Sequence, residues 1–142
     1  MVQIILENMD IKNKKSEISD FFSYNLSMNE KELINKCLTD KDAIETYPFA
    51  DSKYKGTPIL RHKSNNKWFG VVFEQEGILY INLKARPEEI CILKDQFPES
   101  ILPAWHMNKR HWYKADVNSI STELLDRLIK RSFEITQSKK KK

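Results

Sequence analysis

Apolar and polar positions alternate along the middle of the chain, which is the pattern of β-strands. Leu79, Ile81 and Leu83 are separated by more polar residues, as in a strand with one buried and one wetter face. The segment 68–73 is apolar at nearly every position, which predicts a central strand covered on both faces. Short turn-forming stretches rich in asparagine or glycine separate these segments. The sequence therefore predicts three consecutive strands, over 59–63, 67–74 and 78–84.

Helical spacing of apolar residues precedes and follows these strands. Residues 27–30 match a capping box, in which a side-chain hydroxyl and a carboxylate bond the free backbone amides of a helix start. The apolar face of this first helix runs through residues 33–38. Pro87 predicts the start of a second helix, because its missing N–H costs nothing at the first helical position.

A third helix is predicted from after Ser121 to about Thr136. Its apolar residues recur at helical spacing, and its basic residues, Arg131 among them, are expected on the outer, solvated side. Two short β stretches are predicted before it, one around Trp105 and the other over 111–117. The order α-β-β-β-α-β-β-α predicts an α+β fold, with a single antiparallel sheet and helices packed on it.

One domain of ordinary size accommodates these elements, because 142 residues are enough to bury a real core. We assign this domain to residues 27–137. Residues 1–26 form an N-terminal extension in which a short helix is expected over about 15–25. Residues 138–142 form a lysine tail that we expect to be disordered.

The charge balance changes once the tail is set apart. The net charge of +4 and the basic pI invite a nucleic-acid interpretation. However, Lys139 to Lys142 account for the whole excess, so the body of the chain is neutral. A neutral body argues against strong binding to duplex DNA.

Cysteine usage and hydropathy indicate the cellular environment. Cys37 and Cys91 both lie in amphipathic helical patterns, and we expect both to be buried free thiols rather than a disulfide. No apolar run approaches the ~20 residues that a membrane span needs, and the first residues do not match a secretion signal. The sequence thus predicts a soluble cytoplasmic protein that does not enter membranes.

Several segments together match the pattern of one protein family. They are Tyr47-Pro48-Phe49, Asn65-Asn66-Lys67-Trp68-Phe69, Ile81-Asn82-Leu83-Lys84, Pro87-Glu88, and a run from Pro103 to Trp112 whose specific part is His106-Met107-Asn108-Lys109-Arg110-His111-Trp112. Over about residues 28–136 the chain resembles the MmcQ/YjbR family of small bacterial proteins. This resemblance implies a single antiparallel sheet of the secretion-chaperone-like or CyaY-like type. It also implies a DNA-binding-like protein with a double-wing motif.

The segment 106–112 is the candidate recognition surface, because cations, histidines, an amide and an indole gather in a connecting segment. Its cations can contact phosphates, its amide can read a base edge and its indole can stack on a base. The ends of neighbouring strands, including residues 61–63, can widen the patch. The candidate nucleic-acid- or ligand-binding residues are Lys84, Arg86, Trp105, His106, Asn108, Lys109, Arg110, His111 and Trp112. In the alternative interpretation the segment is a structural turn, in which Met107 and Trp112 pack inward, and Asn108 and a histidine form hydrogen bonds to the backbone.

Three functional hypotheses follow. The first is a non-enzymatic binding module for DNA, and the second is a protein-interaction or chaperone-like adaptor. The third is a small-molecule pocket lined by Trp105, His106, Asn108 and Trp112.

Enzymatic chemistry has weaker support in the sequence. Acid–base or metal chemistry at His106 and His111 is an alternative, but their i,i+5 spacing is not that of a helical metal pair. No serine or cysteine stands in a nucleophile motif. The chain holds 3 glycines and no glycine-rich phosphate loop. We therefore expect neither a cofactor nor a metal.

Overall fold

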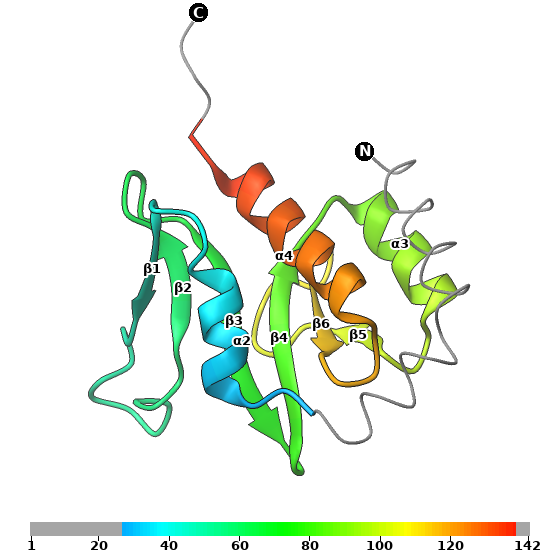
Figure 1. Cartoon of the computed structure of the whole chain (residues 1–142), viewed down its shortest axis with the longest axis horizontal. Helices are drawn as coiled ribbons and strands as arrows, with labels where there is room; N and C mark the ends of the chain where they lie inside the picture. Colours follow the sequence, from blue (N-terminus) through cyan, green and yellow to red (C-terminus); the bar gives the residue numbers. More distant parts are fainter. Residues whose placement is uncertain (1–26, 139–142) are drawn as a thin grey trace, which may run out of the picture.

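The computed structural model describes residues 27–138 of the chain. Within this range, one antiparallel sheet of six strands runs in the order β1-β2-β3-β4-β6-β5, and three helices accompany it (Figure 1). The elements are α2 (Glu30–Cys37), β1 (Ala43–Thr46), β2 (Ile59–His62), β3 (Trp68–Gln75), β4 (Ile78–Lys84), α3 (Pro87–Gln96), β5 (Ile101–Pro103), β6 (Trp112–Asp116) and α4 (Thr122–Thr136). The α+β class and the single antiparallel sheet with helices on it confirm the sequence prediction.

Two predictions from the sequence concern chain ends that lie outside the described residues. They are the short helix expected over 15–25 and the disorder expected for Lys139 to Lys142. Among the described residues, no helix combines the length and the apolar character that crossing a bilayer requires.

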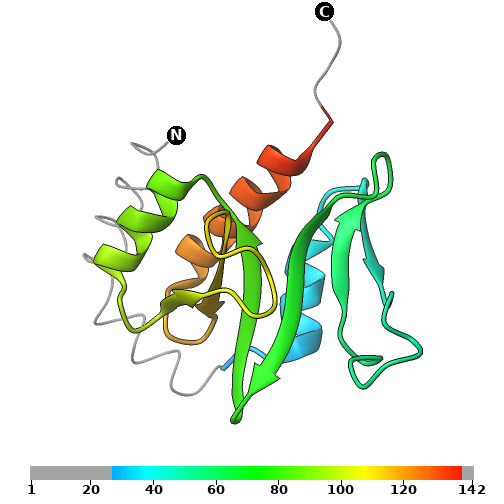
Figure 2. The ribbon, with the colours of Figure 1, turned by 180° about the vertical axis from the view of Figure 1, so that it is seen from behind.

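Helices α2 and α4 cover one face of the sheet and bury the main core between them and the strands (Figure 1). Leu125 and Leu128 of α4, Leu33 of α2, and Ile81 and Leu83 of β4 are each at most 1% exposed. Full burial of such a side chain contributes about 1.5–3 kcal/mol, so this layer supplies most of the folding energy. Helix α3 lies beside the sheet and contacts β5 (Figure 2).

The opposite face of the sheet, hereafter the open face, carries a second and smaller apolar cluster. Its buried members are Ile59, Val71, Phe73 and Tyr80. Two connecting segments cover this cluster: loop 47–58, between β1 and β2, and loop 104–111, between β5 and β6. In Figure 2 the yellow loop 104–111 crosses in front of the sheet. Strand β3 is therefore apolar on both faces, as its sequence predicts, because each face has its own cover.

The β-structure differs from the sequence prediction in two details. Strand β1 pairs with β2 through partners from Ala43↔His62 to Thr46↔Ile59, and no strand was predicted there. This edge strand has only one buried side chain, Ala43, so it lacks the alternation that marks a strand in sequence. The stretch expected around Trp105 ends earlier, because β5 stops at Pro103 and Trp105 begins the crossing over the open face.

The start of the first helix was predicted two residues too early. The N-cap is Asn29 rather than Ser27, and the capping box pairs Asn29 with Glu32. The Glu32 amide donates to Asn29 Oδ1 at 2.8 Å, and the Asn29 amide donates to Glu32 Oε1 at 3.0 Å. Asparagine caps a helix as well as serine does, so the sequence offered two overlapping choices.

Two side chains differ from the prediction in their exposure to solvent. Arg131, expected outside, is 8% exposed and forms a two-point ion pair with the fully buried Glu89 of α3. The Nε–Oε1 and Nη2–Oε2 distances are 3.2 and 3.0 Å. Cys91, expected inside, is exposed on α3, whereas Cys37 is buried as predicted. The prediction for Cys91 was wrong because α3 turns only one narrow side toward the core.

Candidate functional site

Asn82 of β4 fixes the start of loop 104–111 to the open face through two hydrogen bonds. The Asn82 amide donates from Nδ2 to the carbonyl of Trp105 at 2.7 Å, and the Trp105 N–H donates to Asn82 Oδ1 at 3.0 Å. Asn82 is fully buried, so its amide has no water to exchange for these bonds. The indole of Trp105 then stacks on Phe73 of β3, with ring centroids 4.5 Å apart. The loop therefore begins from a defined position over the sheet.

The next residue, His106, turns the loop toward loop 47–58. Its φ is 56°, in the left-handed region that few residues other than glycine adopt. Such a conformation costs about 1 kcal/mol or more and persists only where neighbours hold it. The imidazole Nε2 lies 3.3 Å from the hydroxyl of Tyr54, and the two ring centroids are 5.4 Å apart. This contact joins the two loops across the open face.

A cavity of about 340 Å³ opens between the two loops and the sheet. Its sheet side is formed by Ile59, Trp68 and Val71. Its loop side is formed by Phe49, Tyr54, Trp105, His106 and Met107. We call this cavity the aromatic pocket, because four of its eight lining residues carry a Phe, Tyr or Trp ring.

The aromatic rings of the pocket contact one another edge to face. Phe49 lies 5.9 Å from Trp68 and 6.3 Å from Tyr54, and Tyr54 lies 5.5 Å from Trp105, measured between centroids. Aromatic pairs prefer such perpendicular contacts because the positive edge of one ring meets the negative face of another. The contacts join residues of both loops to the sheet, so neither loop shapes the pocket alone.

The rest of the 106–112 segment forms a tight turn. The side chain of Asn108 accepts a hydrogen bond from the Arg110 amide at 2.8 Å, and its carbonyl accepts one from the Trp112 amide at 3.0 Å. Asn108 therefore bonds the backbone, as the structural interpretation of the segment expects. Lys109 and Arg110 are exposed, and their side chains make no hydrogen bond or ion pair within residues 27–138. The turn thus presents two uncommitted cations.

The remaining predicted residues do not line the pocket. Trp112 is 8% exposed and pairs in register with Lys84, whose Nζ lies 5.9 Å from the indole centroid. Arg86 is exposed at the N-cap of α3, and its amide donates to Glu89 Oε1 at 3.2 Å. His111 is half-buried and accepts from the amide of Ala85 through its carbonyl. Of the nine predicted residues, Trp105 and His106 line the pocket.

Five lining residues, Phe49, Tyr54, Ile59, Trp68 and Val71, were not among the predicted site residues or the predicted packing residues around them. Phe49 had a signal in the Tyr47-Pro48-Phe49 motif of the resemblance, but Tyr54 had none, because its loop has no periodic pattern. The predicted small-molecule pocket included Asn108 and Trp112, which do not line the cavity.

Charge is distributed unevenly over the neutral body. The strand register directs Arg61, Lys84 and Lys114 to the open face, and loop 104–111 adds Lys109 and Arg110 with no acidic residue of its own. Lys114 is already engaged, since its Nζ lies 2.7 Å from Gln75 Oε1 and 4.4 Å from the Tyr80 centroid. The strand carboxylates divide between the faces, with Asp116 on the open face and Glu45 and Glu74 on the helix-covered face.

The histidines of the segment do not form a cluster of titratable groups. Within residues 27–138, no three or more His, Cys, Asp and Glu side chains converge as metal ligands would. His106 contacts Tyr54, and His111 lies immediately before β6, at the other end of the turn. Acid–base chemistry at these histidines stays a hypothesis from the sequence.

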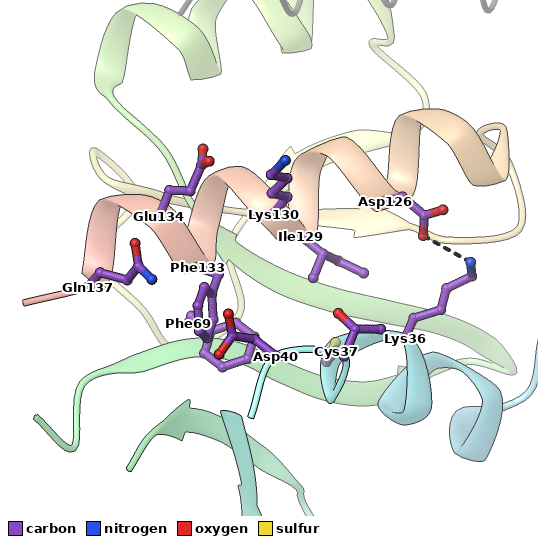
Figure 3. A pocket seen from close by; sticks show the side chains of 11 residues that line it. Lys36, Cys37, Asp40, Phe69, Asp126, Ile129, Lys130, Phe133, Glu134 and Gln137 are labelled. Atoms are coloured by element: carbon purple, nitrogen blue, oxygen red, sulfur yellow. Dashed lines mark hydrogen bonds and ion pairs between the residues drawn. The ribbon is translucent and has the colours of Figure 1, made fainter. Parts of the chain in front are cut away.

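A second cavity, of about 530 Å³, lies on the other side of the sheet, between α2 and α4 (Figure 3). Cys37, Phe69, Ile129 and Phe133 form its apolar floor, and both charge signs alternate along its rim. The ion pair between Lys36 Nζ and Asp126 Oδ1, at 2.9 Å, joins the two helices across one end. A rim of mixed charge gives no preference for an anionic or a cationic ligand, so the open face is the better candidate site.

Comparison with known proteins agrees with this fold and with the family resemblance. The chain is 35% identical over 102 residues to YyaQ of Bacillus subtilis, described as an uncharacterized protein, and this match covers 64% of the chain and 83% of YyaQ. It is 38% identical over 74 residues to YbdF of Escherichia coli O157:H7, also described as uncharacterized, covering 51% of the chain and 60% of YbdF.

Two solved structures share the fold. The Deinococcus radiodurans protein DR2400, which has a DUF419 domain, superposes with a TM-score of 0.65 at 27% identity, over 77% of this chain and 78% of DR2400. A Pseudomonas syringae protein solved by NMR superposes with a TM-score of 0.66 at 26% identity, over 81% of this chain and 98% of that chain. The YjbR family model matches residues 38–135, which hold all six strands of the described sheet from end to end, as well as α3 and nearly all of α4. The chain therefore belongs to the YjbR family.

Proposed function

We propose that this YjbR-family protein is a non-enzymatic binding module for nucleic acid, DNA in the first place. The binding surface is the open face, and loop 104–111 is its centre. The observation that carries the proposal is the pair of exposed cations, Lys109 and Arg110. Their turn is held in place by the bonds of the buried Asn82 to Trp105 and by the bond from the Arg110 amide to the Asn108 side chain.

Electrostatics supports an anionic ligand on this face. Lys109 and Arg110 make no ion pair within residues 27–138, and their loop contains no acidic residue. Arg61 and Lys84 extend the positive surface along the sheet. Phosphate contacts supply most of the sequence-independent affinity for nucleic acid, and unpaired cations make them without first breaking a protein contact.

The fixed loop supports the proposal in a second way. Binding costs about 0.5–1.5 kcal/mol for each flexible side chain that must be ordered, and more when a loop must be ordered too. The two bonds from Asn82 and the stacking of Trp105 on Phe73 set the loop's position before any ligand arrives. The cost that remains is that of the lysine and arginine side chains.

The proposed setting is the bacterial cytoplasm, where nucleic acid is accessible. The matched relatives of Bacillus and Escherichia support a bacterial setting. The two cysteines, which are both free thiols, are in keeping with a reducing compartment.

The test is a fluorescence-anisotropy titration of labelled duplex and single-stranded DNA over a series of salt concentrations. In Lys109→Ala/Arg110→Ala we expect affinity to fall roughly tenfold or more at low salt. The slope of log affinity against log salt should decrease by about 2, because two phosphate contacts are lost.

The matched control is Arg127→Ala/Lys130→Ala, which removes the same two charge types from exposed positions on α4, on the other side of the sheet. It should leave the affinity nearly unchanged. A further variant carries alanine at Lys139 to Lys142. The proposal would be refuted if binding disappeared when these four lysines are replaced and did not change in Lys109→Ala/Arg110→Ala.

A further inference from the structure

The aromatic pocket offers apolar ring surface to a ligand, and phosphate binding alone does not involve this surface. Its rings belong to half-buried side chains, so part of each ring is available to a ligand. A volume of about 340 Å³ is near the lower end of the range of small-ligand sites. The main core on the other side of the sheet does not include these rings. Such a pocket suits one planar ring system.

The two polar atoms at the wall of the pocket can each donate or accept a hydrogen bond. The Tyr54 hydroxyl and His106 Nε2 lie 3.3 Å apart, and either atom can donate the hydrogen bond between them. When the hydroxyl donates to the imidazole, its oxygen can accept from a ligand. When the imidazole donates, the hydroxyl hydrogen is available to a ligand instead. The pair can therefore meet a ring edge that carries donors, acceptors or both.

Positive charge stands beside the rings. The Nζ of Lys53 lies 5.2 Å from the Tyr54 ring centroid, and Arg61 pairs in register with Trp68 on the open face. Lys109 and Arg110 follow the lining residue Met107 along the chain. An apolar aromatic pocket beside cations is complementary to a planar ring joined to an anionic group. A nucleobase on its sugar phosphate has this combination.

We infer that the aromatic pocket holds one unpaired nucleobase of a single strand, while the neighbouring cations hold the phosphates of the strand. This inference rests on the proposed function and makes it more specific. A base inside a duplex has both ring faces covered by its neighbours, so only a base outside the stack can enter the pocket. The protein should accordingly prefer single strands to duplexes, with little dependence on base identity, as in other stacking sites.

The decisive experiment compares two single strands of equal length and charge. One is an oligothymidylate, and the other has the same sugar-phosphate backbone without bases. The intact chain should bind oligothymidylate roughly 5- to 150-fold more tightly, the range expected for stacking one base. In Tyr54→Ala the two affinities should become equal through a loss confined to oligothymidylate. Tyr47→Ala removes an exposed tyrosine from the same loop without touching the pocket, and it should keep the preference.

A second readout reports on the pocket directly and does not depend on a folded variant. Trp68 and Trp105 line the pocket, so oligothymidylate should change the tryptophan fluorescence of the intact chain, and the base-free strand should not. Thymidine monophosphate is titrated in parallel. Monophosphate binding with no binding of either strand would mean that the ligand is a free nucleotide, which would overturn the single-strand inference.

The outcomes separate this inference from the proposed function. Equal affinity of the intact chain for the two strands, with loss of both in Lys109→Ala/Arg110→Ala, would overturn the base pocket and support nucleic-acid binding. Affinities that are unaffected by Lys109→Ala/Arg110→Ala would overturn the proposed function. A preference for oligothymidylate that survives Tyr54→Ala, in a variant shown by circular dichroism to be folded, would also overturn the base pocket.

Discussion

The side chain of Asn82 pairs with the backbone of Trp105 as a neighbouring strand would, giving one hydrogen bond and receiving one. The two residues are 23 positions apart, and β5 ends two residues before Trp105. A side-chain amide thus substitutes for the backbone pairing that the sheet no longer supplies at this point. It keeps the polar backbone of a covered loop satisfied where water has little access.

Replacing Asn82 should therefore loosen the loop and destabilise the fold. In Asn82→Ala we expect a loss of about 2 kcal/mol in the free energy of unfolding, because a donor and an acceptor of Trp105 lose their partners. Asn35→Ala, at an exposed position of α2, is the matched control and should leave the free energy of unfolding nearly unchanged. Urea unfolding followed by tryptophan fluorescence measures both. A loss below about 0.5 kcal/mol, the size of an ordinary surface change, would contradict this role.

The buried ion pair between Glu89 and Arg131 should behave differently when one or both partners change. Arg131→Met leaves the carboxylate of the fully buried Glu89 without its counter-charge, and we expect a loss of about 3–5 kcal/mol. Adding Glu89→Gln removes the stranded charge and keeps an acceptor for the Arg86 amide at the start of α3. The double variant should therefore be more stable than Arg131→Met alone. Urea is the suitable denaturant, because guanidinium salts would screen the charges.

Lowering the pH should destabilise the fold through protonation of Asp42. Its carboxylate accepts from the Ser64 hydroxyl at 2.8 Å, from the Ser64 amide at 3.1 Å and interacts with His62 Nδ1 at 3.2 Å. These contacts, the Ser64 hydroxyl first, lower the pKa of Asp42 below the ordinary value of 3.8. The folded chain thus binds its proton less readily than the unfolded chain does. The resulting stabilisation is complete above the unfolded pKa and is lost as the pH falls through the folded one.

Asp42→Asn should therefore lower the unfolding midpoint at pH 7 and flatten its decline between about pH 4 and the folded pKa. Asp51→Asn, in an exposed loop, serves as the control and should leave the pH profile unchanged. Thermal unfolding monitored by circular dichroism across this pH range gives both profiles. If the unfolding midpoint falls equally steeply with decreasing pH in Asp42→Asn and in the intact chain, Asp42 is not the source of the pH dependence.

The two thiols should differ sharply in reactivity. Burial raises the pKa of Cys37 to about 12, so at pH 8 it carries almost no thiolate and is shielded as well. Cys91 is exposed on α3. A thiol reagent that releases a chromophore should modify one thiol per chain rapidly and the second only on unfolding. Cys91→Ser should abolish the rapid phase, and rapid labelling that persists in this variant would show that Cys37 is accessible.

The sequence was sufficient for elements whose pattern is local. The alternation in β4, the apolar run in β3 and the helix start at Pro87 all arise within a few residues, and the structure confirms each. The edge strand at Ala43–Thr46 could not be found in this way, because its pairing with β2 creates it and only one of its side chains is buried.

The candidate site was only partly predictable for a related reason. The cations Lys109 and Arg110 were recognised because they lie together in one segment. Tyr54 reaches His106 across 52 positions, and Arg131 reaches Glu89 across 42. Neither pair leaves a periodic signal, since each depends on how separate elements pack. Residue type alone therefore placed Arg131 outside and gave Tyr54 no role.

The separation of the two apolar clusters by the sheet has a consequence for divergence within the family. The residues beneath loops 47–58 and 104–111 belong to the smaller cluster, and the helices stabilise the sheet from the other side. Exposed positions of these loops can therefore vary with little loss of foldability, as they do in antibody loops on a conserved framework. An engineer can therefore alter the ligand preference by substituting the exposed loop residues, while Asn82 and Trp105 keep loop 104–111 on the sheet.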